Sequence, residues 1–144
     1  MGGEERLDEG LAIERLNVAL KNQYRSALQY SIMAASLHGL EAQALGAKLT
    51  EFGDEELDGV RRLIEKIVSF GGEPTTEVAT ARFHRSAGDA LAWIIECEQE
   101  AVESLQEAIE PTGREGRSEA LEHMLEHLIM RKQQQIDFLE RAAG

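Results

Sequence analysis

The amino-acid sequence predicts an all-α protein, an antiparallel four-helix bundle with one long crossover between its second and third helices. Apolar residues recur at helical spacing in four long stretches, and only 2 of the 144 residues are proline. The outer two breaks between these stretches are short, whereas the middle break spans residues 71–87 and is long enough to cross the bundle. A chain of this length suits one domain, which we predict over residues 1–144.

The first helix is expected from about residue 10 to residue 38. Residues 1–10 before it are charged and contain glycine, so we expect them to fray. After it, Gly39 is expected to take the left-handed conformation that commonly ends a helix. Helical spacing predicts an inward stripe of Leu16, Leu20, Gln23, Ala27, Tyr30, Ala34 and Leu37.

The second helix is expected over about residues 41–70, antiparallel to the first because the join is short. Its stripe consists of Leu45, Leu49, Phe52, Glu56, Gly59, Leu63, Ile67 and Phe70. An isolated charge buried among such side chains is too costly to persist. Glu56 is therefore expected to be paired, bound to a metal, or protonated.

The crossover at residues 71–87 opens with the helix breakers Gly71, Gly72 and Pro74. The third helix is expected over about residues 88–110, with Leu91, Ile95, Glu98, Val102, Leu105 and Ile109 facing inward. Pro111, Gly113 and Gly116 then break the pattern. The fourth helix is expected over about residues 117–142, with Leu121, Leu125, Leu128, Lys132, Gln135 and Leu139 facing inward.

Charge and cysteine content exclude several classes of function. The formal net charge of −12 argues against a nucleic-acid partner and against an anionic membrane surface. The longest uncharged run, residues 26–40, is too short to span a bilayer. Cys97 is the only cysteine and cannot form an intrachain disulfide, so a reducing compartment is expected. We expect a soluble, cytoplasmic protein.

Each of the four stripes carries a polar interruption near its middle. The spacing repeats, with 33 residues from Gln23 to Glu56 and 34 from Glu98 to Lys132. Each second member also has a stripe position three residues further on. Antiparallel packing would bring all of these positions to one layer of the core: Gln23, Glu56, Gly59, Glu98, Lys132 and Gln135. One polar position on one helix and an i, i+3 pair on the next is the arrangement used by carboxylate di-iron bundles.

The chain resembles the bacterioferritin branch of the ferritin-like superfamily over nearly its whole length. The segments that carry this resemblance are residues 16–24, 29–30, 55–58, 62–67, 71–74 and 136–140. The resemblance implies a ferritin-like bundle. It also implies which positions of this chain correspond to the family's di-iron ligands. The family's first-helix carboxylate falls on Gln23, and its first Glu-x-x-His motif falls on Glu56 and Gly59.

In the second half of the chain the family's third-helix glutamate is retained as Glu98, and its second Glu-x-x-His motif falls on Lys132 and Gln135. Both histidines and two of the four carboxylates are therefore missing from the family's pattern. A lysine ammonium has no lone pair to donate to a metal and repels a cation. The resemblance thus implies a degenerate di-iron site, with no confident metal ligand; Glu56 and Glu98 are the residual candidates.

A salt bridge is expected where the metal would lie. We predict that Lys132 pairs with Glu56 and Glu98, while Gln23 and Gln135 donate hydrogen bonds to the remaining carboxylate oxygens. Gly59 is expected to leave room for a water where the family has an imidazole.

The first two helices carry a second apolar face, formed by Leu28 and Ile32 on the first and by Leu57 and Ile64 on the second. This face predicts a homodimer joined through these helices, where the family forms its dimers; a larger internal core is the alternative. The methionine that ligates haem at the bacterioferritin dimer interface falls on Leu57, so no haem is expected.

The function expected from these features is a non-catalytic binding or structural role, as an auxiliary subunit beside a ligand-complete ferritin-like subunit. Iron homeostasis is implied by the resemblance alone. No cofactor is expected, and any iron would be held weakly. Two alternatives remain: a bacterioferritin-like ferroxidase with a weak or single-metal site at Glu56 and Glu98, and a stand-alone interaction module.

Overall fold

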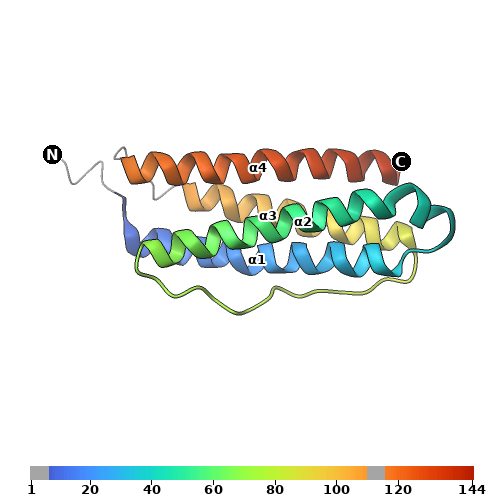
Figure 1. Cartoon of the computed structure of the whole chain (residues 1–144), viewed down its shortest axis with the longest axis horizontal. Coiled ribbons are helices and arrows are strands. Elements are labelled where there is room, and N and C mark those ends of the chain that lie inside the picture. Colours follow the sequence, from blue (N-terminus) through green and yellow to red (C-terminus); the bar gives the residue numbers. More distant parts are fainter. Residues whose placement is uncertain (1–6, 110–115) are drawn as a thin grey trace.

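The computed structural model describes residues 7–109 and 116–144, which form four helices and no strand (Figure 1). Helix α1 spans Glu9–Ser36, α2 spans Gly39–Ser69, α3 spans Ala87–Ile109 and α4 spans Gly116–Ala143. The predicted all-α four-helix bundle is confirmed. Glu110, Pro111 and Gly113, where the sequence predicts the end of the third helix and the break after it, lie outside the described residues.

Helix α1 begins earlier than the sequence suggested. The Asp8 carboxylate accepts a hydrogen bond of 3.1 Å from the Leu11 amide and so caps the helix. Leu7 is buried and packs into the core. The prediction that residues 1–10 fray is therefore wrong for residues 7–10, because a cap and an apolar anchor hold them. Residues 1–6 lie outside the part of the chain that is described.

Every pair of neighbouring helices in the bundle is antiparallel (Figure 1). Gly39 joins α1 to α2 with a φ of +67°, the left-handed conformation that the sequence predicted there. The crossover segment, residues 70–86, then runs the length of the bundle alongside α1 and returns the chain to the end where α2 began. Helix α3 therefore runs in the same direction as α2, and α4 in the same direction as α1.

Side chains of α1 hold the crossover segment in an extended conformation. Asn17 donates to the Glu73 carbonyl at 3.0 Å and accepts from the Thr75 amide at 2.7 Å. Near the other end, Gln29 donates to the Arg82 carbonyl at 3.0 Å and accepts from its amide at 2.6 Å. These bonds satisfy backbone groups that have no strand partner, and they fix where α3 begins.

The core consists of two apolar clusters with a polar layer between them along each helix. One cluster includes Leu16, Leu20, Leu63, Ile67, Leu105, Leu121, Leu125 and Leu128. The other includes Tyr30, Met33, Leu49, Phe52, Leu91, Ile94 and Leu139. On α3 the sequence placed Ile95 inward, but Ile94 is the fully buried residue and Ile95 is half-buried, so this helix is rotated slightly from the predicted phase.

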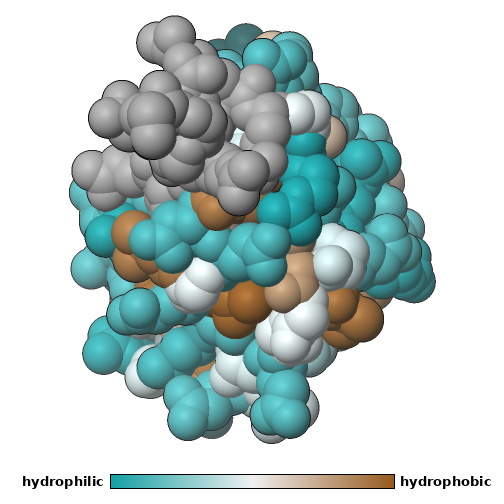
Figure 2. All heavy atoms as spheres, turned by 90° about the vertical axis from the view of Figure 1, so that its left-hand side faces the viewer, coloured by the Kyte–Doolittle hydropathy of each residue, from teal (hydrophilic) through white to brown (hydrophobic). Residues whose placement is uncertain are grey.

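At one end of the bundle the surface is mostly polar. Figure 2, which faces the end of the bundle where α1 begins and α2 ends, shows hydrophilic residues with smaller hydrophobic areas between them. Within residues 7–109 and 116–144, no helix combines the length and the apolar character needed to cross a membrane.

Candidate functional site

The polar interruptions of the four stripes lie at one level, between the two apolar clusters. Each of these positions is buried: Gln23, Glu56, Gly59, Glu98, Lys132 and Gln135. The structure brings Gln23, Glu56, Glu98 and Lys132 into direct contact, while Gln135 lies at the edge of the layer.

Lys132 lies at the centre of the layer and is only 2% exposed. Its Nζ lies 2.7 Å from Glu56 Oε2 and 3.1 Å from Glu98 Oε1. A third contact, of 3.4 Å, reaches Ser26 Oγ. The ammonium group has three hydrogens to donate, and three acceptors surround it. The predicted pairing of Lys132 with both glutamates is confirmed.

Glu98 receives hydrogen bonds on both carboxylate oxygens. Ser26 donates to Oε1 at 2.5 Å, and the Tyr30 hydroxyl donates to Oε2 at 3.1 Å. Sequence reasoning missed both partners. The signal was present, because Ser26 and Tyr30 lie three and seven residues after Gln23 and so share its face of α1.

Gln23 binds Glu56 twice. Its Nε2 donates to the backbone carbonyl of Glu56 at 2.9 Å and also to the carboxyl oxygen Oε2 of the same residue. The remaining oxygens of the two side chains, Gln23 Oε1 and Glu56 Oε1, are buried and have no hydrogen-bond partner among the described residues.

Gly59 leaves room for the Gln23 amide. A Cβ at this position would lie 2.6 Å from Gln23 Nε2, which is too close for unbonded atoms. The Gln23 amide thus occupies the space directly beside the Gly59 Cα, and a water near this position stays a prediction. The missing Cβ allows the amide of Gln23 to reach the backbone of α2.

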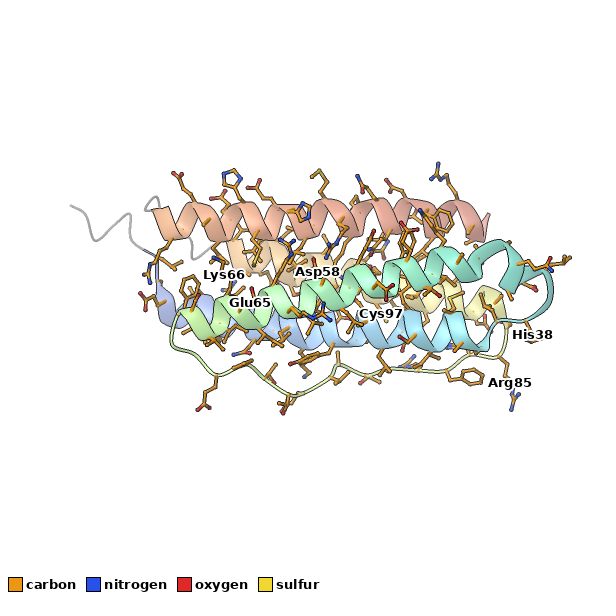
Figure 3. All side chains as sticks on the ribbon, in the orientation of Figure 1. His38, Asp58, Glu65, Lys66, Arg85 and Cys97 are labelled. Atoms are coloured by element: carbon orange, nitrogen blue, oxygen red, sulfur yellow. The ribbon has the colours of Figure 1, made fainter. Side chains whose placement is uncertain are left out.

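Gln135 does not bind either buried glutamate, contrary to the prediction. Its Nε2 donates to Glu55 Oε2 at 2.8 Å, and its Oε1 accepts a long hydrogen bond of 3.5 Å from Tyr30. Nearby, Arg131 donates to the Glu55 carbonyl at 2.6 Å and pairs with Asp58 at 3.2 Å. Asp58, labelled in Figure 3, lies near the middle of α2. These contacts close the layer on its α2–α4 side.

Burial governs the protonation of the layer. It raises the pKa of Glu56 to about 7; the negative charge of Glu98 adds to this shift and Lys132 opposes it. For Lys132, burial acts to lower the pKa, but the two glutamates outweigh burial and the pKa lies above its usual value. Burial, reinforced by Glu98, also raises the pKa of Tyr30 well above its usual range, so the phenol stays a hydrogen-bond donor.

The sequence profile of the ferritin-like domain family matches residues 13–144, which is most of the chain. This protein belongs to the ferritin-like domain family. No match was found among curated proteins.

Solved structures of similar fold cover most of this ferritin-like chain. A ferritin-like, diiron-carboxylate protein from Bacillus anthracis strain Ames has 24% identity and a TM-score of 0.88, covering 95% of this chain and 98% of that one. The bacterioferritin-related protein of Bacteroides fragilis, a dodecameric thioferritin, has 17% identity and a TM-score of 0.83, covering 97% and 87%. At these identities the likeness establishes the fold.

A third similar structure is the bacterioferritin of Rhodobacter capsulatus, with 23% identity and a TM-score of 0.77. The match covers 90% of this chain and 81% of that one. That bacterioferritin has a metal-free dinuclear site and a haem iron. In the described part of this ferritin-like chain, no group of three or more His, Cys, Asp or Glu residues is placed to hold a metal ion.

Replacing Lys132 should destabilise this ferritin-like protein strongly. In Lys132→Met the two glutamates lose their buried counter-charge, and we expect a loss of about 3–5 kcal/mol in the free energy of unfolding at neutral pH. Urea unfolding followed by circular dichroism measures it. The control is Lys21→Met, because the Lys21 side chain is 47% exposed and forms a surface ion pair of 3.7 Å with Glu77, so its removal should change stability by less than about 1 kcal/mol. Equal effects of the two substitutions would contradict the central role of Lys132.

The raised pKa of Glu56 predicts a pH dependence. The ordinary value is 4.5 and the folded value about 7, so the stabilising contribution of the protonated carboxyl is complete below pH 4.5 and is lost as pH rises through 7. Between these limits, wild type should lose on the order of 3 kcal/mol of stability relative to Glu56→Gln. Denaturant unfolding of both proteins across this pH range measures the difference. Parallel stability curves would show that Glu56 does not titrate in this way.

Proposed function

We propose that this ferritin-like protein has a buried salt bridge in place of a di-iron centre and serves a non-catalytic, binding or structural role. The observation that carries the proposal is the position of Lys132 Nζ between Glu56 Oε2 and Glu98 Oε1, at 2.7 and 3.1 Å. The positive charge that a metal would supply to these carboxylates comes from the chain itself.

The side chains of the layer do not fit two iron ions. Such a centre needs several anionic oxygen donors and, in this kind of bundle, imidazoles. The layer offers the carboxylates of Glu56 and Glu98, and an ammonium group that cannot ligate a metal. Gly59 has no side chain to donate, and the Gln23 amide occupies the space beside it.

An auxiliary role would explain a ferritin-like chain without its metal centre. In our proposal it works beside a ferritin-like subunit that has all of its di-iron ligands. Its link to iron homeostasis is inferred from its family alone. The second candidate is a ferroxidase with a weak or single-metal site at Glu56 and Glu98. The observation that favours it is that both carboxylates converge on one atom, so that a metal displacing Lys132 would meet both.

We also propose a homodimer through α1 and α2. Leu28 and Leu57 are 43% and 46% exposed and lie on neighbouring helices, where they add apolar area to one face. Between these helices lies a groove of about 300 Å³, lined by Ser31, Ala34, Ala35, Gly53 and Leu57 among others. Ile32 and Ile64 are half-buried, and Ile64 also packs against the core. The similarity to a dodecameric thioferritin supports assembly into multimers.

No haem is proposed at this interface. The resemblance to bacterioferritins places their haem-ligating methionine at Leu57. The Leu57 side chain is an aliphatic group with no atom that can ligate iron.

Iron loading tests the proposed loss of the di-iron centre. After aerobic loading with ferrous iron and gel filtration, metal analysis of wild type should find far fewer than two iron ions per chain. The matched variant carries Gln23→Glu, Gly59→His, Lys132→Glu and Gln135→His, and should recover tight binding of two. Gln23→Glu belongs in this set because it restores a carboxylate at the first-helix position. With a side chain at position 59 the residue at position 23 must also move aside, since a Cβ there would lie 2.6 Å from the present Gln23 Nε2. If wild type retains as much iron as the restored variant, the proposal fails.

Sedimentation tests the proposed dimer. Stable interfaces bury on the order of 1,600 Å², and a charge at their centre is strongly unfavourable. Ile32→Asp should therefore shift the protein from dimer toward monomer at micromolar concentration. Glu65→Asp, on the exposed part of α2, is a control that should leave the dimer intact. A wild-type protein that is already monomeric would refute the interface.

A further inference from the structure

We propose that the buried layer binds one proton on Glu56 Oε1, which is donated to Gln23 Oε1, so that the two side chains form a cyclic carboxylic acid–amide pair. In such a pair the amide N–H donates to one carboxyl oxygen while the acid O–H donates to the amide oxygen. The inference rests on the proposed function, because it requires that Lys132 and not a metal faces Glu56.

The hydrogen bonds to Glu56 are one-sided. Lys132 Nζ and Gln23 Nε2 both donate to Oε2, whereas Oε1 is buried and accepts nothing from the described residues. A buried carboxylate oxygen without a donor is costly, because it has lost its water and gained no partner. A protonated carboxyl has the opposite pattern, with a carbonyl oxygen that accepts and a hydroxyl that donates. Oε2 accepts two hydrogen bonds, as the carbonyl oxygen of an acid does. Oε1 accepts none, which fits a hydroxyl oxygen.

The second carboxyl of the layer shows the contrast. Glu98 accepts from Ser26 and Lys132 on Oε1 and from Tyr30 on Oε2, as an ionised carboxylate should. Of the two buried glutamates, Glu56 is thus the one whose surroundings fit the acid form.

The orientation of the Gln23 amide is set by the backbone. The Glu56 carbonyl can only accept, so the amide nitrogen must face it, and it does so at 2.9 Å. This leaves Gln23 Oε1 as an acceptor that is buried and has no donor among the described residues. The two unpaired oxygens therefore belong to side chains that an N–H···O bond already joins. In our proposal one proton on Glu56 Oε1 satisfies both.

The charges around Glu56 favour the same proton. Glu98 on α3 and Lys132 on α4 face it directly, and Tyr30 on α1 is a neutral donor held by Glu98. Further out, Glu55 on α2 is bound by Gln135, while Asp58 pairs with Arg131 of α4 and with Arg62. With both glutamates ionised, the fully buried triad would carry one net negative charge. With Glu56 protonated it is neutral, which burial favours.

Infrared spectroscopy of the carboxylic acid carbonyl stretch tests the pair. Wild type at about pH 6, where ordinary Asp and Glu side chains are ionised, should show the band of a buried, hydrogen-bonded carboxylic acid, and the band should disappear at about pH 9. Glu56→Gln should lack the band at both pH values. In Gln23→Leu the acid hydroxyl loses its acceptor, so the band should move to higher wavenumber. Glu55→Gln, which removes a neighbouring carboxyl of the same helix outside the triad, should leave the band unchanged.

A crystal structure of wild type at atomic resolution tests the pair without any substitution that could impair folding. The Cδ–Oε1 bond of Glu56 should be longer than its Cδ–Oε2 bond, whereas the two bonds of Glu98 should be equal. Equal bonds in Glu56 with an ordered water between the two unpaired oxygens would overturn the inference. So would a carboxylic acid band that survives Glu56→Gln or does not move in Gln23→Leu. Iron analysis of the same wild-type sample separates these outcomes from failure of the proposed function, since bound iron would contradict the latter.

Discussion

A lysine ammonium and two carboxylates meet in the centre of this bundle, and the rest of the core is arranged around the need to satisfy them. Each buried charge has lost its water, and attraction between opposite charges compensates only when further hydrogen bonds complete the arrangement. Those bonds come from all four helices. Helix α1 supplies Ser26 and Tyr30, α2 and α3 supply Glu56 and Glu98, and α4 supplies Lys132.

This polar layer also constrains the register of the helices. A shift of one helix by a single turn would place a charge against leucines of the neighbouring apolar clusters, where no partner exists. Buried polar groups of this kind add little net stability over an apolar core, but they penalise alternative packings heavily. We therefore interpret the layer as a determinant of specificity, with the apolar clusters on either side providing most of the stabilisation.

The layer also links the fold to the proposed role. Carboxylate di-iron bundles use six inward polar positions, a glutamate from each of two helices and a Glu-x-x-His pair from each of the other two. The polar layer of this chain instead holds two glutamates, an internal cation, a glycine and two amides. The small residue at Gly59 and the Gln23 side chain that approaches it act as a pair: the amide reaches the α2 backbone only because no Cβ stands in its way. Metal binding by this layer would thus require several coordinated changes.

The sequence by itself determined the helices, their order and, to within about one residue of rotation, the inward face of each. Periodicity alone placed Gln23, Glu56, Glu98 and Lys132 inward, and the spacing of the stripes placed them at one level, because an apolar stripe must face the core whatever its partners are. Ser26 and Tyr30, three and seven residues after Gln23, could also be placed on this face of α1 from the sequence. Their hydrogen bonds to Glu98 were not predicted.

Tertiary structure alone decided which of these groups bind one another. A helical period does not specify the rotation of a helix to better than about one residue. On α3, for example, Ile95 was predicted to face inward, but Ile94 is the fully buried residue. It also cannot show that Gln135 turns outward to Glu55, or that both donors to Glu56 reach the same oxygen. These outcomes depend on small differences in the relative positions of side chains on different helices. Only the packed bundle sets those positions.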